Sequence, residues 1–161
     1  MNKQRLTSTL NKAKQVCLEH GRKFTIQRKQ ILQILLTTDV PLSAYELASC
    51  YKLRTSSSVS VMSVYRILSF LESVNLVRRL NSANKYIAYG TDSEVFKREA
   101  SLFLICRHCQ KVETLAVSQS DVAKLFPHFD DAGFTSQTKQ FEIKHVIFTR
   151  GIILKKPTDL L

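Results

Sequence analysis

The chain has 161 residues, 44% of them hydrophobic, with only 4 glycines and 3 prolines. This composition predicts one or two small folded domains and excludes a disordered chain. No apolar run reaches the roughly 18 residues of a membrane helix, and the N-terminus lacks the apolar core of a secretory signal. We therefore expect a soluble, cytoplasmic protein without a membrane partner.

The positive charge is concentrated in one half of the chain. Residues 1–90 hold 14 lysines and arginines against 4 acidic residues, whereas residues 91–161 hold 10 against 9. This asymmetry predicts a polyanion-binding half joined to a nearly neutral half. A basic membrane-surface protein would need long lysine and arginine faces, but the helical segments here carry mixed charges.

Three helices are predicted in the first 55 residues. The first covers Leu6 to His20, with an apolar side formed by Leu6, Leu10, Ala13, Val16 and Cys17. Thr25 can cap the second, which buries Ile31, Ile34 and Leu35 and leaves Arg28 exposed near its start. Ser43 and Glu46 form a capping box that opens the third helix, which is expected to run to about Leu53.

A fourth helix is predicted from Ser60 to Asn75, with Ser60 or Ser63 as its cap. Its buried stripe follows helical spacing and consists of Val64, Ile67, Leu68 and Leu71. Tyr65 and Arg66 fall about 100° and 200° from Val64, so Arg66 must point into solvent. An exposed arginine at a helix start can reach a guanine edge in the major groove. The alternative is a surface helix with one ordinary arginine.

Apolar and polar residues then alternate in Leu76–Leu80 and Lys85–Tyr89, around a turn rich in Asn and Ser. This pattern predicts a β-hairpin. Helices followed by a basic hairpin form a winged helix-turn-helix, whose hairpin lies beside DNA. Arg78, Arg79 and Lys85 would be its charges, or else ordinary solvated positions.

The second half is predicted as a small α/β dimerisation domain, which makes the whole chain α+β. We expect strands at Leu102–Ile105, Val112–Val117, Gln140–Phe148 and Ile152–Lys155, with a helix capped by Ser118–Asp121. The predicted boundaries are 1–89 for the DNA-binding domain, 90–100 for a hinge linker and 101–161 for the dimerisation domain. About 70 residues provide little core, so we expect a homodimer.

Several motifs resemble those of the Fur family of bacterial metalloregulators, and within it those of the zinc uptake regulators (Zur). They are FTIQR (24–28), LSAYEL (42–47), SVYRIL (63–68), FLICRHCQKVE (103–113) and GF (133–134). The resemblance covers about Cys17 to Lys155. It implies a sequence-specific, dimeric repressor that binds double-stranded DNA.

The same resemblance implies a role for each matching DNA-binding residue. Tyr65 and Arg66 match the family's base-reading pair, and Ser63 opens that motif. Arg28 and Tyr45 match positions that contact the phosphate backbone. Arg79 and Lys85 complete the predicted DNA-binding set, from the hairpin pattern and not from the resemblance.

The family's structural zinc uses two CxxC pairs, of which only Cys106 and Cys109 have counterparts here, because no cysteine follows Cys109. Zinc needs four ligands. His145 or another chain could complete a zinc site; otherwise the two thiols are free.

The family's regulatory metal ligands match Arg78, Tyr89, Glu99 and Thr114. Arginine cannot ligate a metal and stays positive. We therefore expect no regulatory metal site and a metal response that is weak or lost. Arg78 paired with Glu99 could replace the cation.

Two other readings stay open. One is a thiol redox-responsive regulator that uses Cys106 and Cys109, and the other is an adaptor that dimerises with an intact family member. An enzyme is not expected, because the sequence has no Ser/His/Asp set, paired carboxylates or glycine-rich phosphate loop.

Overall fold

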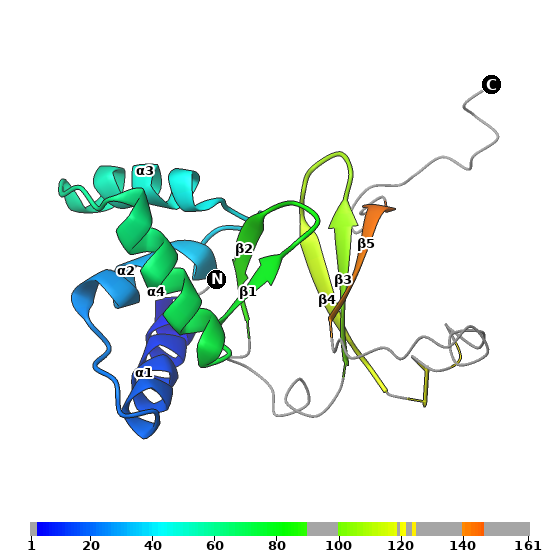
Figure 1. The fold of residues 1–161 in the computed structure, drawn as a ribbon, viewed down its shortest axis with the longest axis horizontal. Helices are drawn as coiled ribbons and strands as arrows, with labels where there is room; N and C mark the ends of the chain where they lie inside the picture. Colours follow the sequence, from blue (N-terminus) through cyan, green and yellow to red (C-terminus); the bar gives the residue numbers. More distant parts are fainter. Residues whose placement is uncertain (1–2, 90–99, 119, 122–123, 125–139, 147–161) are drawn as a thin grey trace.

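The structure is a computed structural model that describes residues 3–89, 100–118, 120–121, 124 and 140–146. Four helices come first: α1 (Lys3–Glu19), α2 (Ile26–Leu36), α3 (Ala44–Thr55) and α4 (Val61–Ser73). The strands are β1 (Val77–Leu80), β2 (Lys85–Ala88), β3 (Ala100–Cys106), β4 (Val112–Val117) and β5 (Gln140–Val146). Figure 1 shows the β1–β2 hairpin between the helices and the other three strands.

Side-chain oxygens cap three helices where the sequence predicts them. Thr25, Ser43 and Ser60 each accept a hydrogen bond from the backbone N–H three residues on, at 3.2–3.3 Å. Ser60, and not Ser63, therefore caps α4. In the capping box of α3, Glu46 also accepts a hydrogen bond from the Ser43 N–H at 2.6 Å.

Helix α4 ends at Ser73, before the predicted Asn75, and boundaries of α1 and α3 also differ from the prediction. Helix α1 begins at Lys3, one turn earlier than expected. Helix α3 continues past Leu53 to Thr55, because Ser56 adopts a left-handed φ of 55° and donates its N–H to the Lys52 carbonyl. That left-handed C-cap residue ends the helix.

The helices share one hydrophobic core. The α4 stripe is buried as predicted, with Ile67 the most exposed of its members at 8%. From the other helices the core takes Leu10, Ala13, Cys17, Ile31, Leu32, Ile34, Leu35, Ala44, Leu47 and Tyr51. Leu6 and Val16, expected on the buried side of α1, are only half-buried. In the part of the chain that the structure describes, no helix has both the length and the apolar character needed to cross a membrane.

The hairpin is attached to the helical core by a backbone bridge. Strands β1 and β2 pair antiparallel, with Arg78 opposite Ile87. Leu42, just before α3, exchanges two hydrogen bonds with Tyr86, at 2.7 and 3.0 Å. This third backbone segment makes the hairpin the wing of a winged helix, and we call residues 77–88 the wing.

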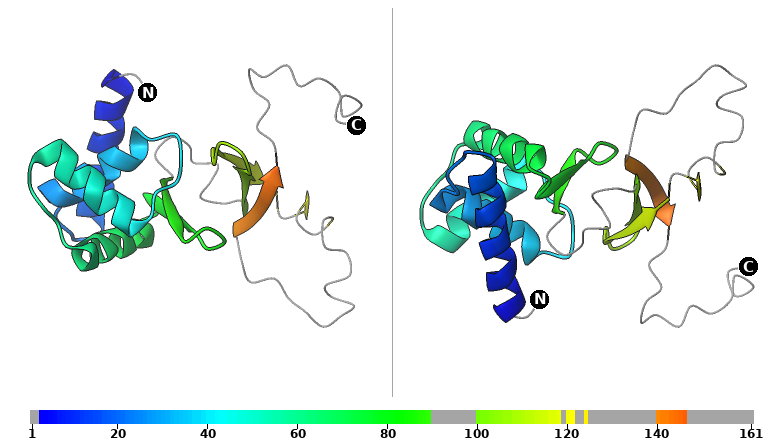
Figure 2. Two further views of the ribbon diagram at one scale, coloured as in Figure 1. Left: turned by 90° about the horizontal axis from the view of Figure 1, so that it is seen from above. Right: turned by 90° about the horizontal axis from the view of Figure 1, so that it is seen from below.

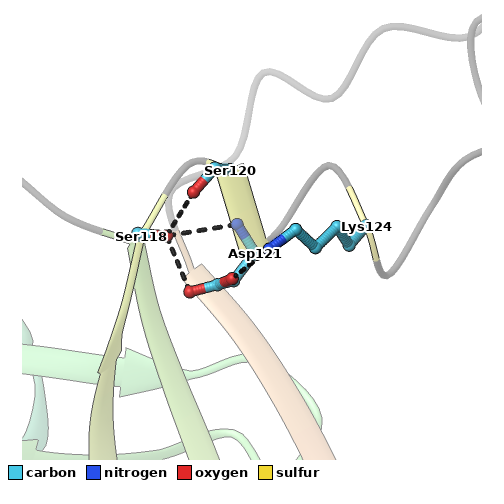
Figure 3. Close-up of polar contacts among 4 residues, drawn as sticks. All are labelled: Ser118, Ser120, Asp121 and Lys124. Atoms are coloured by element: carbon cyan, nitrogen blue, oxygen red, sulfur yellow. Dashed lines mark hydrogen bonds and ion pairs between the residues drawn. The ribbon is translucent and has the colours of Figure 1, made fainter.

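The second sheet has the order β4-β3-β5 (Figure 2). Strand β3 is central, antiparallel to β4 and parallel to β5. The first three predicted strands are present; the predicted strand at Ile152–Lys155 and the GF motif lie outside the described residues. Of the helix expected after Ser118 only the start is described. There Ser118 Oγ accepts the Asp121 N–H at 3.1 Å, and Lys124 pairs with Asp121 at 3.2 Å (Figure 3).

A second, smaller core joins the wing to this sheet. It contains Leu80 and Tyr89 from the wing side and Phe103 and Ile105 from β3. The Tyr89 and Phe103 ring centres are 6.0 Å apart, and the Tyr89 hydroxyl lies 2.5 Å from the Ser101 hydroxyl. The wing therefore packs against helices through one face and against the sheet through the other.

Candidate nucleic-acid interface

Helix α4 presents Arg66 to solvent near its N-terminus. Arg66 is exposed, whereas Tyr65 and Ser63 are half-buried. The Ser63 hydroxyl lies 2.9 Å from the Ser60 hydroxyl, so it takes part in the cap. Burial of the α4 stripe fixes the rotation of the helix, and that rotation points Arg66 outward.

Two shallow, neighbouring hollows flank Arg66. One, of about 530 Å³, lies between α2 and α4, and the other, of about 550 Å³, continues along α4. Arg22, Arg28 and Arg66 line both, and Lys23 lines the first. Among the residues that the structure describes, no acidic side chain lines either hollow. Such a concave, uniformly basic surface attracts a polyanion such as the DNA backbone.

Arg28 is held in this surface by two contacts. Its guanidinium carbon lies 3.6 Å from the centre of the Phe70 ring, and its Nη1 donates a 2.6 Å hydrogen bond to the Lys23 carbonyl. The sequence predicts an exposed Arg28, but the side chain is half-buried by this stacking. Phe70 follows Arg66 by one helical turn, so α4 brings the ring and Arg66 to the same side.

The other predicted phosphate contact, Tyr45, stands on α3 and is 66% exposed. Its neighbour Glu46 has a pKa lowered to about 2, chiefly because the Ser43 N–H donates to its carboxylate, with the Ser43 hydroxyl and Lys85 adding to the effect. Lys85 lies 3.0 Å from the Glu46 carboxylate. The ammonium of Lys85 therefore has an acidic partner within the chain, which the sequence pattern did not predict.

The two predicted wing arginines also make contacts within the chain. Arg79 is exposed, and its Nη2 donates to Asn84 Oδ1 at 2.8 Å, across the hairpin turn. Arg78 is half-buried, and its guanidinium carbon lies 4.7 Å from the centre of the Tyr89 ring. Contact of either residue with DNA stays a prediction.

The predicted metal residues are only partly described. Neither Cys106 nor Cys109 is in a disulfide; Cys106 is 2% exposed, and Cys109 is exposed. Thr114 is half-buried on β4, whereas Glu99 and the side chain of His145 lie outside what the structure describes. Within the described residues, no three His, Cys, Asp or Glu side chains gather closely enough to hold a metal ion.

Two thiols do not complete a tetrahedral zinc site, so a structural zinc stays a prediction. A redox role for Cys106 and Cys109 also stays a prediction.

Sequence reasoning missed Phe70 and Glu142. Phe70 is one turn from Arg66, but nothing in the spacing indicates that Arg28 from another helix stacks on it. Glu142, on β5, accepts hydrogen bonds from the backbone of Asn81 and Ser82 in the wing turn. The only available signal was the polar alternation of Gln140, Glu142 and Lys144.

A four-helix head with a wing and a basic surface around an exposed arginine defines a winged-helix DNA-binding protein. Comparison with known proteins agrees. The sequence model of the ferric uptake regulator family matches residues 19–144, so the chain belongs to this family. It is a DNA-binding transcriptional regulator and not an enzyme.

The relatives include both ferric and zinc uptake regulators. The ferric uptake regulation protein of Helicobacter pylori is 29% identical over 107 residues, which cover 66% of this chain and 68% of that protein. The zinc uptake regulation protein of Escherichia coli K12 is 26% identical over 113 residues, or 70% and 64% of the two chains.

A solved structure of a zinc uptake regulator complexed with zinc and DNA has a TM-score of 0.74 at 22% identity, covering 91% of this chain and 95% of that one. The predicted fold class, a winged helix-turn-helix followed by a small α/β domain, is confirmed.

Proposed function

We propose that this chain is a dimeric, sequence-specific repressor that reads DNA through α4 and responds weakly or not at all to metal. The observation that carries the proposal is the exposed Arg66 at the start of α4, beside hollows whose charged lining, within the described part of the chain, is basic and includes Arg22 and Arg28. Such a regulator would act by occupying a promoter.

Each residue of the surface has a distinct part in this proposal. Arg66 donates two hydrogen bonds to the O6 and N7 of a guanine in the major groove. Tyr65 contacts a thymine methyl or the backbone. Arg28, oriented by the Phe70 ring, and Tyr45 contact phosphates, which position the helix without reading sequence.

We infer the homodimer from the apolar face of the β4-β3-β5 sheet, which points away from the wing. Leu115 of β4 and Ile143 of β5 are 42% and 45% exposed. Register with β3 places both on the same face as Leu102 and Leu104. Burial of these apolar side chains between two copies would stabilise a twofold pair, whose two α4 helices reach successive major grooves about 34 Å apart.

We infer weak metal control because Arg78 and Tyr89, which match two regulatory metal ligands of the family, contact each other. A guanidinium fixed on an aromatic ring places a positive charge where the family's resemblance places a dication. A Zur-like regulator with this arrangement would bind DNA without a regulatory metal.

Selection of duplexes from a randomised library by the full chain tests the proposal. We expect an enriched palindrome with half-sites one helical turn apart, bound as a dimer, with affinity that falls steeply between about 50 and 200 mM salt. Recovery of unenriched sequence, or binding that ignores salt, would contradict it.

A further inference from the structure

One face of β5 is directed at the turn of the wing. Gln140, Glu142 and Lys144 alternate along the strand, so their side chains share a face. Register places them beside Ser101, Phe103 and Ile105 of β3, respectively. Phe103 and Ile105 pack against Leu80 and Tyr89 of the wing side, so the same face of the sheet offers apolar contacts through β3 and polar contacts through β5.

Four hydrogen bonds from this face reach backbone atoms of the wing. Glu142 Oε1 accepts the Asn81 N–H at 2.8 Å, and Oε2 accepts the Ser82 N–H at 3.0 Å. Gln140 Nε2 donates to the Arg79 carbonyl at 2.8 Å, and Lys144 Nζ donates to the Ser82 carbonyl. The Gln140 amide also donates to Glu142 Oε1 at 3.0 Å, which steadies the carboxylate.

A carboxylate held by two successive backbone N–H groups is a strong, directional contact. Burial alone would raise the pKa of Glu142, but hydrogen bonds from Ser82, Asn81 and Gln140 lower it. The acceptor is therefore a carboxylate at neutral pH. It joins residues that are about 60 positions apart in the chain.

These contacts leave the side chain of Arg79, in the wing, exposed. Arg79, whose carbonyl is bound by Gln140, keeps an exposed side chain. A contact that blocked DNA binding would be expected to cover such side chains. The contacts from β5 involve backbone groups of the wing turn and the Ser82 side chain, so they constrain the orientation of the wing without covering the Arg79 side chain.

We propose that Glu142 is a positioning residue that locks the wing, and with it α4, at a fixed orientation to the β3–β5 sheet. The inference rests on the proposed function, because a dimer reads two half-sites only when its two heads keep a fixed separation. The lock consists of protein groups alone, so it would hold the heads without a bound metal.

The test compares the full wild-type chain with Glu142→Ala and Glu142→Gln, and with Asp121→Asn as control. Asp121 is exposed, its carboxylate contacts Ser118 and Lys124 (Figure 3), and its change removes the same charge. Hydrogen exchange of the Asn81 and Ser82 amides reports the contact. We expect both to exchange about tenfold faster in Glu142→Ala and unchanged in Asp121→Asn.

DNA binding reports the consequence, with the selected two-half-site duplex and a duplex that carries one half-site. We expect Glu142→Ala to lose about tenfold in affinity for the first and less than about twofold for the second, because only the first requires both heads at once. Glu142→Gln, which keeps one acceptor oxygen, should lose less.

Unchanged exchange of the two amides, or an equal loss on both duplexes, overturns the proposal. If Glu142→Ala does not fold, the same criteria apply to Glu142→Gln. A wild-type chain that binds neither duplex overturns the proposed function instead, whatever the exchange rates show.

Discussion

The guanidinium of Arg78 lies over the ring of Tyr89, 4.7 Å from its centre, where the sequence motifs place two ligands of a regulatory metal. The Tyr89 hydroxyl in turn reaches Ser101 on β3 at 2.5 Å. A cation, a ring and a hydroxyl therefore connect the wing to the sheet.

This arrangement predicts that DNA binding does not require a regulatory metal. Affinity for the selected duplex should change by less than about twofold when zinc is added or removed with a chelator, because the Arg78 charge opposes a dication. Titrations by fluorescence anisotropy check this, with native mass spectrometry of the same samples to count bound zinc. A tenfold fall in affinity upon chelation would contradict it.

The Tyr89–Ser101 hydrogen bond should contribute to the stability of the chain. Ser101 is 3% exposed, so its hydroxyl loses a buried partner in Tyr89→Phe. We expect each of Tyr89→Phe and Ser101→Ala to lower the free energy of unfolding by about 1 kcal/mol, and the double variant to lose less than the sum. Urea unfolding measures both, with the exposed Tyr45→Phe as control. Strict additivity would mean that the hydroxyls do not interact.

The capping box of α3 should make stability depend on pH. The pKa of Glu46 falls from 4.5 to about 2 in the folded chain. The contribution of the Glu46 carboxylate to the free energy of unfolding is therefore complete above about pH 4.5 and is lost as the pH falls toward 2. The difference in urea midpoint between wild type and Glu46→Gln should be larger at about pH 6 than at about pH 3. A difference that does not change with pH would contradict the assignment.

In DNA binding, Arg28 should contribute its positive charge, whereas Phe70 should contribute only by orienting the Arg28 side chain. Arg28→Ala is expected to weaken binding to all sequences alike and to reduce the salt slope by about one. Phe70→Leu removes the ring but keeps the charge, so affinity should fall while the slope stays. Salt titrations of both variants on selected and random duplexes distinguish these effects. An altered base preference in Arg28→Ala would not fit a phosphate contact.

Local patterns explain why so much of the helical head could be predicted. Caps at Thr25, Ser43 and Ser60 depend on residues three positions apart, and the α4 stripe depends on helical period, so neighbouring residues determine both. Arg66 points outward for the same reason. The hairpin follows from alternation around a turn-forming segment.

Contacts between distant segments could not be predicted in this way. Nothing near Arg28 indicates that it stacks on Phe70, and nothing near Lys85 indicates its pairing with Glu46, because both depend on how separate elements pack. Glu142 is the clearest case. Its alternation with Gln140 and Lys144 indicates a strand face, but not that the face binds the backbone of a wing some 60 residues earlier.

The most direct test of the account is base preference at the position that Arg66 is proposed to read. Wild type, Arg66→Ala and the control Arg107→Ala, an exposed arginine in the turn after β3, would each be titrated against the selected duplex and its single-base variants at fixed salt. The account predicts that Arg66→Ala loses about 1–3 kcal/mol of binding free energy and no longer distinguishes the bases at one position of each half-site. Arg107→Ala should behave like wild type. An Arg66→Ala chain that keeps both the affinity and the base preference of wild type would contradict the account.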